Sequence, residues 1–204
     1  MSQIADFLIP ILIFSSISIM IVLLTIVNYR RVKKLTKIFQ NQAHNRNGII
    51  KTGFFIYFPS LEFEYHHNKV KVYAIPGGKN SSSSTRIIVD FKYPTHQNMV
   101  IYRERFASNI KKKFGMQDIA LNVDYFDEEV IVKGSDELYI KKILTFGLQE
   151  KILGIINKYN AYICLENYSL EIYVPKVLYD ESAYDELIST TLTLIKKVKG
   201  IDDI

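Results

Sequence analysis

The uncharged stretch at residues 7–29 constrains what this chain can fold into more than any other part of the sequence. Its 23 residues include no Asp, Glu, Lys or Arg, and a helix of that length spans about 34 Å. A bilayer has a hydrocarbon core of roughly 30 Å, so the helix would cross it with some tilt. Leu8, Ile9 and residues 11–13 point in all directions within two turns, whereas a core helix keeps a polar face. We therefore expect a transmembrane helix.

The flanks of this stretch favour a retained signal-anchor over a cleaved signal peptide. Residues 1–6 contain an acid and no base, whereas a signal peptide begins with a basic segment. Bulky and basic residues follow the stretch, and a signal peptidase site needs small ones. The helix is therefore expected to stay in the membrane as an anchor.

Basic residues directly after the stretch give the predicted helix an orientation. No Lys or Arg precedes the stretch, and this asymmetry places the side that follows it in the cytoplasm. Each base near anionic headgroups would contribute about 1 kcal/mol to membrane binding. The predicted membrane-surface contacts are Arg30, Arg31, Lys33, Lys34 and Lys37. We expect a single-pass inner-membrane protein with its N-terminus outside and the lipid bilayer as one partner.

The net charge of the chain comes from these five bases. The sequence has 26 Lys+Arg and 21 Asp+Glu, and residues 38–204 hold 21 and 20 of them. Nucleic-acid-binding domains usually carry a strongly basic face. We therefore expect no nucleic-acid partner.

The chain divides into a stalk, a linker and one folded domain. We expect residues 1–40 to form the membrane helix and its basic stalk, and the polar residues 41–48 to form a short linker. Residues 49–204 are then a cytoplasmic domain, long enough to bury a core without disulfides or metal.

Alternating apolar and polar residues predict strands in this domain. Leu61, Phe63 and Tyr65 alternate with polar residues, and a second alternation at 69–73 follows a turn, which predicts a hairpin. Further strands are expected at 51–58, 87–93, 98–102, 119–125, 130–133, 161–165 and 170–174, and helices at 103–114, 137–144, 148–159 and 181–199. Because strands come in runs, we predict an α+β fold with a mainly antiparallel sheet covered on one face by helices.

The residues that could carry chemistry do not complete a catalytic or metal-binding pattern. Cys164 is the only cysteine and lies in an apolar run, so it is expected to fill the core. His66 and His67 are adjacent, and a strand would point them to opposite faces. Gly77-Gly78-Lys79 lacks the spacing and the following Ser or Thr of a phosphate loop. We expect no bound cofactor and no metal.

One part of the domain resembles a known family. The likeness is carried by Tyr125-Phe126-Asp127, the strand that ends before Ser135-Asp136, Leu144-Thr145, and residues 148–153. These motifs form a turn, a helix cap and a helix break. Residues 120–175 resemble a widespread family of uncharacterised prokaryotic membrane-anchored domains, in which a Phe-acid turn, a strand ending in Ser-Asp and a helix with Leu-Thr recur. The resemblance implies no catalytic residue.

Binding is therefore the predicted function. We expect an interaction or scaffold domain that binds a protein partner at the membrane, for example as an accessory subunit of a membrane complex. The predicted contact surfaces are the five bases, the loop at 76–85, and a polar sheet face with Glu62, Glu64, Lys69 and Lys71. The alternative is a membrane-tethered hydrolase or small-molecule sensor, for which the acids at 124–129 would form the site.

Overall fold

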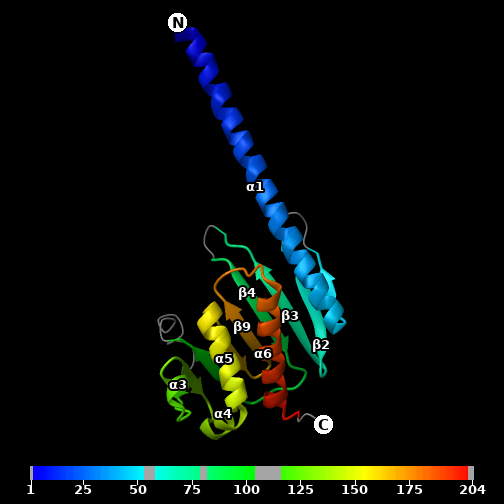
Figure 1. Cartoon of the computed structure of the whole chain (residues 1–204), viewed down its shortest axis with the longest axis vertical. Helices are drawn as coiled ribbons and strands as arrows, with labels where there is room; N and C mark the ends of the chain where they lie inside the picture. The colour runs from blue at the N-terminus through cyan, green and yellow to red at the C-terminus, as the bar shows by residue number, and fades with distance from the viewer. Residues whose placement is uncertain (1, 53–57, 79–81, 104–115, 202–204) are drawn as a thin grey trace.

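One long N-terminal helix projects from a domain built on a single sheet. The computed structural model describes residues 2–52, 58–78, 82–103 and 116–201, and in the first helix it describes side chains from Ile13 onwards. Helix α1 (Ser2–Arg46) has 45 residues and is therefore about 68 Å long. Figure 1 shows that its N-terminal part projects away from all other elements, whereas its C-terminal part lies beside the sheet.

Nine strands form one sheet in which every neighbouring pair is antiparallel. Their order across the sheet is β1-β2-β3-β4-β9-β8-β5-β7-β6. The strands are β1 (Ile49–Lys51), β2 (Ser60–Tyr65), β3 (Asn68–Ile75), β4 (Ser84–Asp90), β5 (Met99–Tyr102), β6 (Gln117–Asp118), β7 (Ile131–Gly134), β8 (Tyr162–Glu166) and β9 (Ser169–Val174). The predicted β2–β3 hairpin is confirmed.

An apolar row crosses the sheet on the face that the helices cover. The pairing register places one residue of each of seven strands in this row, and each is at most 2 % exposed. The row consists of Leu61, Val72, Ile87, Ile172, Ile163, Ile101 and Val132. Successive side chains of a strand point to opposite faces, so the residues between them form a second, more polar face.

Helices cover the apolar face of the sheet. Helices α5 (Phe146–Tyr159) and α6 (Glu181–Lys199) lie on it together with the C-terminal part of α1 (Figure 1). The shorter helices are α3 (Asp124–Asp127) and α4 (Glu137–Ile143). Helix α6 ends at Gly200, whose φ of 62° lies in the left-handed region that glycine adopts readily. The predicted α+β fold is confirmed.

The linker that the polar sequence predicts at residues 41–48 is wrong for most of its length. Residues 41–46 continue α1, and Gln42 and Ala43 are buried against the domain. The chain turns at Asn47, which has a φ of 52°, and the Gly48 amide donates to the carbonyl of Ala43 at 2.8 Å. Because only one side of the helix meets the core, polar residues on its other sides do not interrupt it.

The strand predicted at 119–125 is also wrong. Strand β6 ends at Asp118, before this segment; residues 119–123 form a loop, and helix α3 begins at Asp124. The Asp127 carboxylate accepts the backbone amides of Leu121 and Val123, each at 3.1 Å, so these donors are not available to a neighbouring strand. The break between α4 and α5 falls at Leu144 and Thr145. The strand predicted at 51–58 and the helix predicted at 103–114 lie largely outside the described residues.

Candidate functional site

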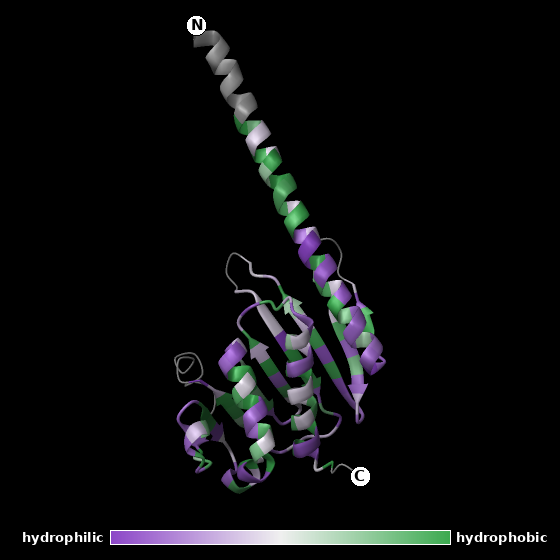
Figure 2. Cartoon of the chain, in the orientation of Figure 1, coloured by the Kyte–Doolittle hydropathy of each residue, from purple (hydrophilic) through white to green (hydrophobic). Residues whose placement is uncertain are grey.

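The outer half of α1, residues 13–29, has the surface of a membrane-spanning helix. Large apolar side chains are exposed all around it, for example Phe14 at 72 % and Leu24 at 61 %. Figure 2 shows this part as an apolar band that ends where polar residues begin. By length and composition the helix could cross a membrane, and none of its apolar window is buried inside the molecule.

Three of the hydroxyl groups in this half donate hydrogen bonds within the helix. Ser16, Ser18 and Thr25 each donate a hydrogen bond to a backbone carbonyl three or four residues earlier, at 2.8 to 2.9 Å. A polar group in hydrocarbon is costly unless it has such a partner. These hydroxyls therefore do not weaken the case for a membrane span.

The five predicted membrane-surface bases are exposed at the end of the apolar band. They occupy several sides of the helix, and Val32 and Leu35 between them turn toward the domain. One base also reaches the domain: burial raises the pKa of Tyr179, and the charge of the nearby Arg31 opposes that rise. Tyr179 lies in the connection from β9 to α6 and was not predicted to contribute. Headgroup contact by Arg30, Arg31, Lys33, Lys34 and Lys37 stays a prediction.

The inner half of α1, residues 31–46, is part of the domain core. Its buried side chains are Leu35, Ile38, Phe39, Gln42 and Ala43. The Phe39 ring meets that of Tyr184 in α6 edge to face, with centroids 5.1 Å apart.

Polar contacts also join the inner half of α1 to α6. The amide of Asn41 donates to the Glu181 carboxylate at 2.9 Å, and Arg46 pairs with Asp185 at 3.0 Å. Both contacts are formed at the N-terminal end of α6. The inner half therefore has both apolar and polar attachments to the domain.

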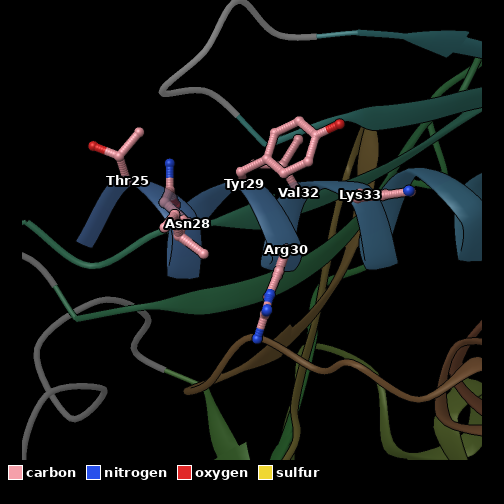
Figure 3. A pocket seen from close by; sticks show the side chains of 7 residues that line it. Thr25, Asn28, Tyr29, Arg30, Val32 and Lys33 are labelled. Atoms are coloured by element: carbon pink, nitrogen blue, oxygen red, sulfur yellow. The ribbon is translucent and has the colours of Figure 1, made fainter. Parts of the chain in front are cut away.

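A hollow of about 610 Å³ lies along α1 at the boundary between its two halves (Figure 3). It combines apolar, hydroxyl, amide and cationic groups, and its described lining residues are Thr25, Ile26, Asn28, Tyr29, Arg30, Val32 and Lys33. A second hollow of about 770 Å³ continues toward Gln40 and shares four of these residues. Tyrosine and basic residues are typical of the membrane–water interface.

The polar sheet face carries charges that are largely paired across neighbouring strands. Glu62 lies between Lys51 and Lys69, at 2.8 and 2.9 Å, and hydrogen bonds from these two lysines lower the pKa of its carboxyl to about 2. Lys71 pairs with Asp90 at 2.6 Å. Three of the four residues predicted to form a contact surface here therefore have partners within the sheet. The other predicted surface, the loop at 76–85, lies partly outside the described residues.

The residues considered for metal binding and catalysis lie apart or are engaged in other contacts in the part of the chain that the structure describes. Among the described residues, no three His, Cys, Asp or Glu side chains are placed to hold a metal ion. Cys164 is 7 % exposed, and burial raises the pKa of its thiol to about 11, so the reactive thiolate is disfavoured. Among the acids at 124–129, Asp127 binds backbone amides and Glu129 pairs with Arg103.

Fold and site together define an α+β protein with an N-terminal helix that could span a membrane. Basic residues of this helix lie where its apolar outer half meets the half that packs on the domain. No family model matches this sequence, and no curated protein matches it. Among solved structures, the chain is similar to the crystal structure of the mycobacterial trehalose monomycolate transport factor A, TtfA, with a TM-score of 0.55 and 8 % identity. The match covers 85 % of this chain and 97 % of the chain in that crystal structure. At this identity the likeness shows a shared fold.

Proposed function

We propose that this protein is a single-pass inner-membrane protein whose α+β domain binds a partner protein at the cytoplasmic surface, as an accessory subunit of a membrane complex. The observation that carries the proposal is the continuity of α1. One helix supplies both an exposed apolar surface of membrane length and five side chains of the domain core. A domain attached in this way is held close to the bilayer in one pose, which suits the binding of a membrane-bound partner.

The charge distribution supports the orientation in this proposal. The five bases follow the apolar band, and no Lys or Arg precedes it, which favours a cytoplasmic domain. The comparison supports the accessory role, because TtfA is named a transport factor and shares the fold.

We also propose that residues 120–175 belong to the membrane-anchored family that they resemble. The supporting observations are the roles of its motifs. The Asp136 carboxylate accepts the Tyr139 amide at 3.0 Å and caps α4, and Thr145 is the N-cap residue of α5.

Purification of the full-length protein in a mild detergent tests the accessory role. We expect a membrane protein to co-purify in stoichiometric amount. The absence of any partner, together with a small molecule that raises the thermal unfolding temperature of the protein, would instead support the sensor or hydrolase alternative.

Cysteine labelling tests the orientation. In a Cys164→Ser background, Ser2→Cys places a single thiol before the uncharged stretch of α1, and Ser182→Cys places one on the exposed surface of α6. A membrane-impermeant maleimide added to intact cells should label the first and leave the second unlabelled until the cells are permeabilised. The reverse pattern would overturn the proposed topology.

A further inference from the structure

A basic groove runs over the outer surface of α6. Its first part is a hollow of about 460 Å³ with four cationic side chains and no acidic residue among its described lining residues. The residues that line it are Arg46, Tyr65, Lys151, Ser189, Leu192, Thr193, Lys196, Lys197 and Ile201. Most of these residues lie in or just after α6, whereas Arg46 comes from α1, Tyr65 from β2 and Lys151 from α5. Figure 1 shows α5 and the end of α1 on opposite sides of α6.

The cations come from three helices, and helix dipoles do not explain all of them. Lys196 and Lys197 lie in the last turn of α6 and Arg46 in the last turn of α1, where positive charge is favourable. Lys151 lies in the second turn of α5, nearer the positive end of that helix dipole. It reaches across to α6, where its ammonium donates to the Thr193 hydroxyl at 3.1 Å.

A second hollow continues the groove and has a mixed lining. It measures about 420 Å³ and shares Arg46, Tyr65 and Leu192 with the first. Phe63 and Leu192 contribute apolar side chains there, and Glu64 and Asp185 contribute carboxylates, of which Asp185 is paired with Arg46. From Asp185 to Ile201 the groove follows α6 for about 24 Å, which is the length of about seven extended residues.

The position of the groove favours a protein over a lipid as its occupant. The cationic part lies at the C-terminal end of α6, and Figure 1 shows this end of α6 on the side of the molecule opposite to the apolar part of α1. In the proposed topology this end faces the cytoplasm. The cationic part of the groove, with Leu192 at its border, complements an extended peptide segment that has acidic residues and an apolar one beside them.

We call these two connected hollows the α1–α6 groove. We propose that the α1–α6 groove binds an extended acidic segment of the partner protein. The inference rests on the proposed function, because it names the place where the accessory domain engages its partner. Acidic side chains would face Lys151, Lys196 and Lys197, and an apolar side chain would lie over Leu192. This binding should weaken as salt is added, because the cations are near the surface.

A peptide probe tests the groove directly. The full-length protein in detergent micelles is titrated into a fluorescein-labelled peptide of about eight residues, in which Glu and Asp alternate with Leu. We expect saturable binding that Lys151→Glu/Lys197→Glu weakens about tenfold or more. The matched control Lys141→Glu/Lys142→Glu, on α4, makes the same change in net charge and should alter the affinity less than about twofold.

Further measurements keep the test decisive. If Lys151→Glu/Lys197→Glu lowers the thermal unfolding temperature, Lys151→Gln/Lys197→Gln replaces it and should still weaken binding several-fold. A photo-crosslinking side chain in place of Ser189 should attach to the peptide, and one in place of Leu138 on α4 should not. Equal weakening by both charge variants, or displacement of the peptide by inorganic pyrophosphate at micromolar concentration, would overturn the proposal in favour of non-specific attraction or a small phosphate-bearing ligand.

The outcome for the groove is separable from the outcome for the proposed function. If the co-purifying partner remains bound to Lys151→Glu/Lys197→Glu, the groove is not its docking site, although the accessory role stands. If no partner co-purifies but the peptide binds as expected, the groove stands and the accessory role fails.

Discussion

The two halves of α1 have the same backbone and opposite surroundings. In residues 13–29, apolar side chains are exposed on every side, and three hydroxyl groups donate to the helix's own carbonyls. In residues 31–46, one side is buried against the sheet and α6, and the other sides are polar. The distribution of apolar residues around the axis, rather than helix propensity, therefore distinguishes a part made for lipid from a part made for a protein core.

The largest effect is expected when charge is placed in the outer half, because charged side chains oppose membrane insertion. Ile19→Arg/Leu23→Arg should add about 5 to 7 kcal/mol to the cost of membrane insertion, at about 2.5 to 3.5 kcal/mol for each charge near the centre of a span. We expect the variant to be lost from the carbonate-resistant membrane fraction. Gln40→Arg/His44→Arg, at exposed positions of the inner half, should remain in it. Retention of the outer-half variant would show that the helix does not span the bilayer.

Truncation of a core side chain in the inner half should destabilise the folded domain instead. Phe39 is 0 % exposed and packs on Tyr184, so Phe39→Ala should lower the free energy of unfolding by about 3 to 5 kcal/mol. Urea unfolding of the detergent-solubilised protein measures this loss, and the membrane fraction should not change. Lys37→Ala, at an exposed position two residues earlier, is the control and should cost less than about 0.5 kcal/mol. A similar loss for both variants would contradict the assignment of Phe39 to the core.

Neutralising bases between the two halves of α1 tests how much their interaction with lipid headgroups contributes to the orientation. Lys33→Gln/Lys34→Gln should reduce the preference for a cytoplasmic domain by about 2 kcal/mol, because each base near anionic headgroups contributes about 1 kcal/mol. The Ser2→Cys labelling assay should then detect a fraction of inverted molecules. Lys141→Gln/Lys142→Gln removes the same charge far from the boundary and should leave the orientation uniform.

The smallest effect concerns the strand that follows the inner half. Lys51 in β1 and Lys69 in β3 lower the pKa of Glu62 in β2 from its ordinary 4.5 to about 2. The ionised Glu62 carboxylate therefore stabilises the folded state fully above about pH 4.5, and this contribution is lost as the pH falls toward 2. Both lysines are about half exposed, so screening leaves on the order of 1 to 2 kcal/mol. Urea unfolding at several pH values should show this loss in the wild-type protein and its absence in Glu62→Gln.

Elements with a local signal could be predicted from the sequence. Alternation at Leu61, Phe63 and Tyr65 identified the β2–β3 hairpin. In α6, acids at the start, bases at the end and Gly200 after it identified a helix whose bounds match those expected. In both cases the pattern that selects the structure lies within the element itself.

Elements that depend on distant contacts could not be predicted. Residues 41–46 are helical because Gln42 and Ala43 meet the domain, and nothing in their polar sequence announces that contact. The α1–α6 groove combines Arg46, Lys151 and Lys197, which are about a hundred and fifty residues apart at the extremes. Only the packing of three helices brings these charges together.

In the proposed topology, the continuity of α1 makes the pose of the domain depend on the thickness of the bilayer. A helix whose apolar length exceeds the local hydrocarbon thickness adapts by tilting. No turn or break separates the apolar band of α1 from the side chains that hold it to the sheet. Each degree of tilt is therefore passed on to the sheet as a rotation, so that a thinner membrane would swing the α1–α6 groove through an arc relative to any partner fixed in the same bilayer.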